Sequence, residues 1–146
     1  MRFLVLHGVN LNMFGRRDPA IYGTATIDDI DSALSALASD LNVELLTFQT
    51  NHEGVMVERI HAALDENLDG LVINAGAWTH YSYAIADALA ILSCPVVEVH
   101  MSHILTREDF RRHSVIAPVS KGCIAGFGLD SYLLGLRAVV GIAREK

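Results

Sequence analysis

A segment near the start of the chain carries the residues with the clearest potential for proton transfer. It runs from His7 to Gly23 and includes Arg16, Arg17 and Tyr22. A nearby guanidinium favours the ionised form of a tyrosine, so a tyrosine close to an arginine can act as a general base. The same pattern is also typical of a solvent-exposed loop with a packing tyrosine. The segment lacks the glycine spacing of a phosphate-binding loop or a dinucleotide fingerprint.

A carboxylate and an imidazole lie two positions apart at Glu98 and His100. On a strand, residues at this spacing share a face. A neighbouring carboxylate favours the protonated ring and fixes its orientation, which suits a general acid. A structural ion pair at the end of a strand fits the pattern as well. His80, His100 and His103 show no familiar ligand spacing, so we expect no bound metal.

Amide, imidazole, hydroxyl and guanidinium groups follow four of the strands predicted below. Such groups hydrogen-bond hydroxyls and carboxylates, so they predict a pocket for a small, oxygen-rich anion. The candidates are Asn10, Asn12, Asn51, His52, Glu53, Asn74, Thr79, His80, Ser102, Arg107 and Arg111.

Short apolar runs alternate with helical patterns along the chain. The runs predict strands near residues 3–6, 43–48, 70–73, 95–99 and 122–127. Apolar residues spaced by three and four predict helices near residues 27–41, 57–68, 85–92 and 133–143, and a short helix is expected over 106–112. Thr26 is expected to cap the first helix, with Asp29 completing a capping box.

Strands that alternate with helices predict a parallel sheet covered on both faces. Five such strands in 146 residues favour one catalytic domain over residues 1–146, with a flavodoxin-like, doubly wound α/β fold. In this architecture ligands bind beyond the carboxyl ends of the strands. The polar groups that follow the strands are therefore expected to meet at one edge of the sheet.

The composition excludes several classes of protein. With 51% hydrophobic residues the chain is not disordered, and a charged fraction of only 19% suggests that other subunits cover part of its surface. The net charge is −6 and the dense basic residues are limited to Arg107, Arg111 and Arg112, so no nucleic-acid partner is expected. No apolar run approaches the roughly 20 residues of a membrane helix, and no signal-peptide pattern is present. We expect a cytoplasmic protein without a membrane partner.

The cysteines and lysines point to neither a structural metal nor a Schiff base. Cys94 and Cys123 stand apart in apolar segments and are predicted to be buried thiols. Lysine is scarce, which leaves Lys121 as the main candidate for Schiff-base chemistry.

Five motifs, in order, resemble the type II 3-dehydroquinate dehydratase family over nearly the whole chain. They are HGVNLNMFGRRDPAIYG, QTNHEG, INAGAWTH, EVHMSHI and TREDFRRHS. The resemblance implies anti elimination of water from 3-dehydroquinate, through an enolate, to give 3-dehydroshikimate. It implies no metal and no other cofactor, and it fits shikimate biosynthesis or quinate breakdown.

The resemblance also implies roles for individual residues. Tyr22 would be the base, and Arg17 would keep it ionised and stabilise developing charge. Asn10 would help to stabilise the enolate through an ordered water. His100 would protonate the departing hydroxyl group, with Glu98 orienting its ring.

The implied substrate-binding groups divide by the part of the substrate they hold. Asn74, His80 and Arg111 would bind the ring hydroxyls. Ser102 and the backbone N–H of Met101 would bind the carboxylate.

The family assembles as homo-oligomers, namely dodecamers built from trimers. Asp87 matches a family position that reaches the substrate site of a neighbouring subunit. Two other hypotheses stay open: a relative that acts on another hydroxy-acid, and a flavodoxin-like module that binds a small molecule without catalysis.

Several positions depart from the usual residues of the family. Val9 stands where proline is common, which predicts a looser turn before Asn10. His7, His103 and Ala86 replace frequent Asn, Asn and Arg residues. None of these positions is assigned to chemistry, so an active enzyme is expected.

Overall fold

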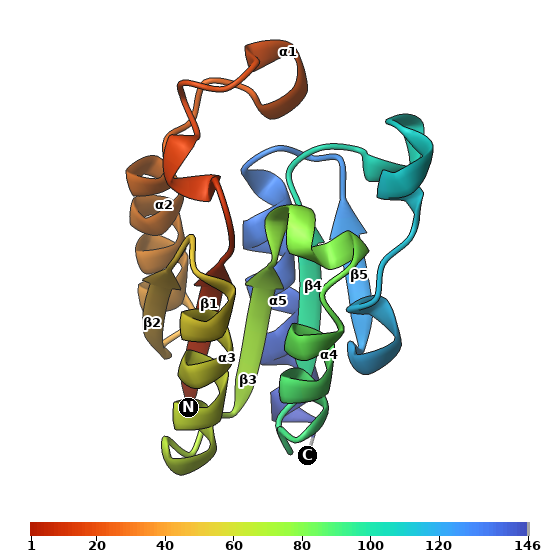
Figure 1. Ribbon diagram of the computed structural model, residues 1–146. Coiled ribbons are helices and arrows are strands. Elements are labelled where there is room, and N and C mark those ends of the chain that lie inside the picture. Colours follow the sequence, from red (N-terminus) through yellow and green to blue (C-terminus); the bar gives the residue numbers. More distant parts are fainter. Residues whose placement is uncertain (146) are drawn as a thin grey trace.

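The computed structural model describes residues 1–145, and a parallel sheet of five strands forms its centre (Figure 1). The strands follow the spatial order β2-β1-β3-β4-β5. Their bounds are Arg2–His7 for β1, Glu44–Gln49 for β2, Gly70–Asn74 for β3, Val96–His100 for β4 and Gly122–Ala125 for β5. The predicted doubly wound α/β fold is confirmed.

Two helices cover each face of the sheet (Figure 1). Helices α2 (Ile27–Asp40) and α5 (Asp130–Arg144) lie on one face, and α3 (Glu53–Ala62) and α4 (Tyr83–Ala90) lie on the other. The predicted capping box begins α2: the Thr26 hydroxyl accepts from the Asp29 N–H, and the Asp29 carboxylate accepts from the Thr26 N–H. No helix in residues 1–145 is both long and apolar enough to cross a membrane.

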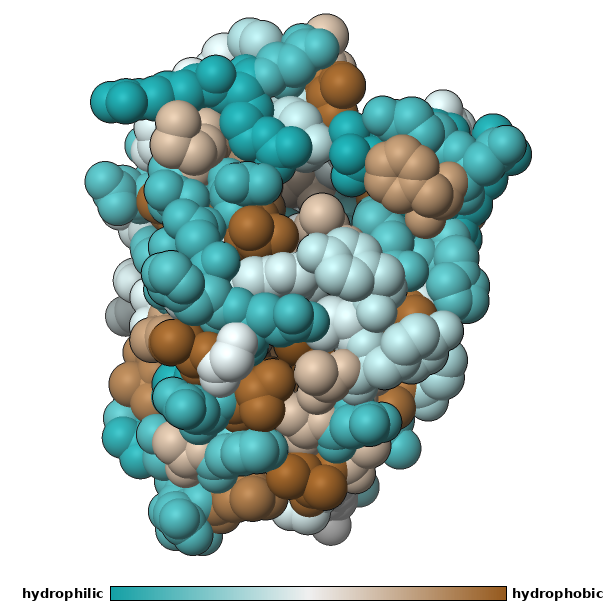
Figure 2. All heavy atoms as spheres, in the orientation of Figure 1, coloured by the Kyte–Doolittle hydropathy of each residue, from teal (hydrophilic) through white to brown (hydrophobic). Residues whose placement is uncertain are grey.

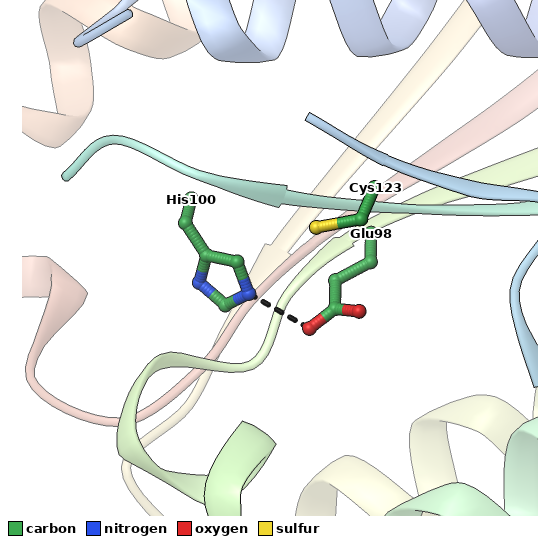
Figure 3. Close-up of side chains that lie close together, drawn as sticks. All are labelled: Glu98, His100 and Cys123. Atoms are coloured by element: carbon green, nitrogen blue, oxygen red, sulfur yellow. Dashed lines mark hydrogen bonds and ion pairs between the residues drawn. The ribbon is translucent and has the colours of Figure 1, made fainter. Parts of the chain in front are cut away.

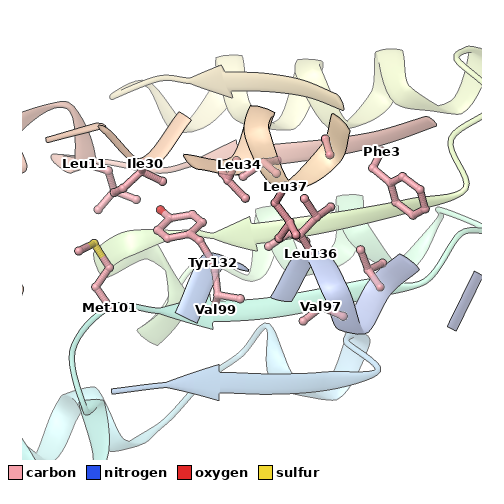
Figure 4. Packing of buried hydrophobic residues seen from close by; sticks show 14 of the residues in the cluster. Phe3, Leu11, Ile30, Leu34, Leu37, Val97, Val99, Met101, Tyr132 and Leu136 are labelled. Atoms are coloured by element: carbon pink, nitrogen blue, oxygen red, sulfur yellow. The ribbon is translucent and has the colours of Figure 1, made fainter. Parts of the chain in front are cut away.

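Alternating side chains of the central strands fill two separate cores. Phe3 and Val5 of β1 pack toward α2 and α5, whereas Leu4 and Leu6 pack toward α3 and α4. Figure 4 shows the first core, where Tyr132 of α5 lies among side chains of the sheet and of α2. Burial of each large apolar side chain contributes about 1.5–3 kcal/mol, so both cores hold the strand ends in fixed positions.

Three helical predictions need correction. The predicted helix over 106–112 is instead two 3₁₀ turns, η4 (Ile104–Thr106) and η5 (Asp109–Arg112), with extended backbone between them. This segment has no continuous apolar face to bury, and Phe110 is exposed, so packing does not stabilise a longer helix.

The helices predicted over 57–68 and 85–92 both begin and end earlier than expected, since α3 begins at Glu53 and α4 at Tyr83. The first ends at Ala62 and continues as η2 (Ala63–Asp65), after which Asn67 adopts a left-handed conformation that turns the chain toward β3. The second ends at Ala90. Leu68 and Leu92 still pack against the second core from the connections that follow. Their spacing therefore predicted burial correctly but placed both helix ends too late.

The long segment after β1 contains short helices that the sequence analysis did not predict. They are η1 (Leu11–Met13) and α1 (Pro19–Tyr22). Asp18 caps α1 by accepting from the Ala20 N–H, Pro19 is the first helical residue, and Gly23 ends the helix with φ +72°. This order of cap, proline and glycine is itself a helix signal.

Two glycines bring the ends of β1 and β3 together. A Cβ atom on Gly8 would lie 2.3 Å from the carbonyl oxygen of Ala75, and one on Gly76 would lie 2.7 Å from that of Val9. Any larger residue would force the two connections apart. The remaining 3₁₀ turns, η3 (Gly76–His80) and η6 (Ala117–Val119), follow β3 and precede β5.

Candidate active site

A cavity of about 120 Å³ lies beyond the carboxyl ends of the central strands. In Figure 2 a recess is visible between polar groups near the upper edge of the molecule, where the α1 segment and the η4–η5 segment flank the strand ends. The lining residues are Val9, Asn10, Leu11, Phe14, Arg17, Tyr22, Asn74, Gly76, Ala77, His80, His100, Met101, Ser102, Ile104, Arg107 and Arg111. The predicted convergence of polar groups at one sheet edge is therefore confirmed.

Tyr22 reaches the cavity from α1 and lies against two guanidinium groups. Arg17 donates from Nη2 to the phenolic oxygen at 2.9 Å, and its Cζ lies 4.1 Å from the ring centroid. The Cζ of Arg107 lies 5.1 Å from the same centroid. Two guanidinium groups therefore lie beside one buried phenol. Phe14 packs against the ring at a centroid distance of 5.8 Å and helps to hold it.

His100 ends β4, and its ring is held by a buried carboxylate. Its Nε2 donates to Oε1 of Glu98 at 2.7 Å, as the shared strand face predicts. Ser114 donates to the same carboxylate, with its Oγ 2.8 and 3.0 Å from the two oxygens. No hydrogen-bond partner is found for His100 Nδ1 among residues 1–145. One ring nitrogen is thus fixed, and the other is left for a ligand.

Asn10 is positioned by its backbone. It adopts the left-handed conformation with φ +65°, which asparagine tolerates better than most residues. Its N–H donates to Oδ1 of Asn51 at 2.8 Å, and the preceding Gly8 donates its N–H to the Asn74 carbonyl at 2.8 Å. These bonds define the turn although Val9 stands where proline is common.

The remaining lining groups present donors and acceptors from several elements. His80 donates from Nδ1 to the His113 carbonyl at 2.8 Å, so the neutral ring presents Nε2 as an acceptor. Burial lowers the pKa of His80, and the nearby His100 and Arg111 lower it further, which keeps the ring neutral. Arg107 donates to the Ser102 hydroxyl at 3.1 Å.

Comparison with known proteins identifies the family. The sequence profile described as dehydroquinase class II matches residues 1–140. The chain belongs to the class II dehydroquinase family. A protein of Syntrophotalea carbinolica named 3-dehydroquinate dehydratase is 64% identical over 143 residues, which cover 98% of this chain and 97% of that protein.

Solved structures of the class II dehydroquinase family share the fold. The type II dehydroquinase of Butyrivibrio crossotus aligns with a TM-score of 0.94 and 41% identity, covering 96% of this chain and 97% of that one. The type II dehydroquinase of Propionibacterium acnes aligns with a TM-score of 0.90 and 45% identity, covering 98% and 96%.

Not every candidate residue lines the dehydroquinase cavity. Glu98 lies behind His100 rather than in the lining, and Asp87 is exposed on α4 outside the cavity. Of the other polar candidates, Asn51 supports Asn10, and Thr79 is fully buried. Four further polar residues do not line the cavity, namely Asn12, His52, Glu53 and His103.

The structure adds one residue to the site, defines the contacts of a second and corrects the environment of a third. Arg107 was a candidate without an assigned role, and it contacts both Tyr22 and Ser102. Ser114 was not considered, because its bond to Glu98 joins positions 16 residues apart. Cys123 was predicted to be buried but is exposed, since β5 is an edge strand. Cys94 is half-buried.

Proposed function

We propose that this chain catalyses the anti elimination of water from 3-dehydroquinate to give 3-dehydroshikimate, with Tyr22 as the base and His100 as the acid. Family membership and the names of the relatives support the reaction. One observation carries the residue roles: Tyr22 and His100 line the same small cavity, and each is held by a charged partner.

The first step is removal of the proton on the carbon next to the ketone. The Tyr22 phenolate accepts this proton, and Arg17, which donates to the phenolic oxygen, favours the anion before the step. The electron pair moves onto the ketone oxygen and forms an enolate, whose charge needs donors close to where it develops. Asn10 lies in the cavity lining and supplies such a donor, directly or through an ordered water.

The second step is loss of the hydroxyl group. The enolate re-forms the ketone and expels the hydroxyl, which takes a proton from His100 Nδ1 and leaves as water. Glu98 accepts from Nε2 and stabilises the imidazolium before this transfer, and Ser114 holds the carboxylate in place. Transfer of the proton from Tyr22 to solvent and of a solvent proton to His100 then restores the starting state.

Recognition of the substrate uses the other polar lining groups. Asn74, His80 and Arg111 bind the ring hydroxyls, and the His80 Nε2 acceptor suits a hydroxyl donor. Ser102 and the backbone N–H of Met101 bind the carboxylate. These groups need neither a metal nor another cofactor.

The proposal extends to a cytoplasmic homo-oligomer, a dodecamer built from trimers. Asp87 is exposed on α4, as required of a residue that acts in a neighbouring subunit. Tyr81 and Tyr83 are exposed close by in the chain, with 59% and 68% of their surface accessible. Large exposed aromatic groups of this kind are typical of surfaces that another subunit covers.

Substitution Tyr22→Phe tests the base. Removal of the phenolic oxygen should lower kcat by at least about 10²–10⁴-fold, because no other group replaces the proton acceptor. The assay follows the ultraviolet absorbance of the conjugated enone product, with and without a chelator.

Tyr81→Phe is the matched control, because it removes one hydroxyl from the proposed subunit-contact surface outside the cavity, and its kcat should stay far above that of Tyr22→Phe. A folded Tyr22→Phe protein with a near-normal rate would refute the assigned base. If the unmodified protein gives no absorbance change, the binding-module hypothesis is favoured instead.

A further inference from the structure

Three different metal-ligating groups meet beside the cavity. One ligand atom each from Glu98, His100 and Cys123 lies within 4.8 Å of the others. Figure 3 shows the His100 ring to the left of the Glu98 carboxylate and the Cys123 thiol above it, directed toward the ring. The sheet register explains the arrangement, because Glu98 of β4 pairs directly with Cys123 of β5 and His100 follows on the same face.

The cluster can be reached from outside the cavity. Glu98 and His100 are buried, with 0% and 5% of their surface accessible, whereas Cys123 is exposed on the edge strand. An ion in solution can therefore meet the thiol first and then contact the two buried groups. The substrate cavity is lined by His100 but not by Cys123, so this approach does not pass through the substrate position.

A thiolate, an imidazole and a carboxylate form a donor set that suits Zn²⁺. Such ligands bind zinc at about 2.0–2.3 Å, with a water completing a tetrahedron. We propose that Glu98, His100 and Cys123 bind Zn²⁺ and that the bound ion inhibits the enzyme. The bound zinc would lower the rate and would take no part in the reaction itself.

Zinc binding displaces one proton from each of two ligands. The Cys123 thiol proton passes to solvent. The proton on His100 Nε2 passes to solvent if the ring is an imidazolium, and to Nδ1 if the ring is neutral. Partial desolvation of the sulfur and the Glu98 charge raise the pKa of Cys123 to about 12. A dication beside the sulfur opposes both causes, since it offsets the carboxylate charge and stabilises the thiolate.

The expected inhibition rests on the proposed role of His100. Zinc on Nε2 leaves a neutral ring that carries its proton on Nδ1. A neutral imidazole is a far weaker acid than an imidazolium, and Glu98 would be engaged by the metal rather than by the ring. Protonation of the departing hydroxyl would then be slow even with substrate bound.

Zinc titration of the intact oligomer in the product assay tests the inhibition. Cys123→Ala should raise the zinc concentration for half-inhibition by about tenfold or more, because it removes one of three protein ligands. Cys94→Ala is the matched control and should respond like the unmodified protein. Both variants should keep the basal rate, and a chelator should restore activity.

Cobalt binding tests the site without relying on the rate. Co²⁺ added to the protein should give a thiolate-to-metal charge-transfer band that is present in Cys94→Ala and missing in Cys123→Ala. Absence of this band, or equal zinc inhibition of both variants, would overturn the site. If the cobalt band appears but zinc does not lower the rate, the metal site stands. The proposed inhibition, and with it the role of His100 as the acid, would then be refuted.

Discussion

Two histidines end strands of the same sheet, on either side of β3, and both pair with a carboxylate. His7 ends β1 and contacts Asp31, with Nε2 2.9 Å from Oδ1. His100 ends β4 and contacts Glu98. The difference lies at the second ring nitrogen. In His7 it accepts from the Tyr132 hydroxyl at 3.0 Å, whereas in His100 it faces the cavity.

The comparison shows that a histidine–carboxylate pair alone does not mark a candidate acid, and that the unused hydrogen-bonding position of His100 is what separates the two rings. His7 is fully buried, and Tyr132 bonds in turn to the Asn74 side chain. Burial raises the pKa of Tyr132, so its hydroxyl stays protonated and donates to His7. This network stabilises the core and holds the Asn74 side chain. The His100 pair instead leaves one ring nitrogen at the cavity without a hydrogen-bond partner among residues 1–145.

The largest expected effect comes from His100→Ala. It should lower kcat by about 10²–10⁴-fold, because the departing hydroxyl loses its proton donor. The free energy of unfolding should fall as well, because the buried Glu98 carboxylate keeps only its hydrogen bonds from Ser114, so the loss of rate is what distinguishes this variant from His7→Ala. Product absorbance and urea unfolding at equal protomer concentration measure the two quantities. A large loss of stability with a modest loss of rate would reverse the assignment of the two histidines.

His7→Ala should mainly lower the free energy of unfolding and leave most of the rate. The Tyr132 hydroxyl would lose its buried acceptor, which costs about 1–3 kcal/mol of unfolding free energy. The rate should fall much less than in His100→Ala, through a displaced Asn74. His7→Asn restores an amide acceptor and should recover part of the stability. If His7→Ala unfolds like the unmodified protein, the network does not stabilise the core.

The fold and the site differ in how far the sequence alone predicts them. The strands and the start of α2 depend on local patterns, such as the apolar run around Val5 and the Thr26–Asp29 capping box, and these predictions are confirmed. The ends of α3 and α4 were predicted too late, because buried residues in the following turns continue the helical spacing. The helical signal at Asp18, Pro19 and Gly23 was present but not used.

The site was predictable where one strand or one loop carries both partners. Glu98 and His100 share a strand face, and Arg17 and Tyr22 lie five positions apart. Ser114 depends on a contact between distant segments, which no local pattern reports. The exposure of Cys123 follows from the position of β5 at the sheet edge, which becomes known only once the strand order is known.

His80 provides the smallest test of the comparison, because its ring lines the cavity but pairs with a backbone carbonyl instead of a carboxylate. Its pKa is lowered, mainly by burial, below the ordinary value of 6.5. As pH falls, the unfolded chain takes up this proton before the folded protein does, so folding stability is lost on the acid side. His80→Asn should reduce the fall in Tm between about pH 7 and about pH 5. An unchanged pH dependence would show that His80 titrates normally.

The position of Tyr22 and Arg17 on one short capped segment has a mechanical consequence. Asp18 and Pro19 lie between them and fix the first turn of α1. A swing of this segment away from the strand ends would carry the phenol and its guanidinium together, still bonded. Product would then leave through the opened entrance while Tyr22, the proposed base, keeps its hydrogen bond to Arg17 for the next turnover.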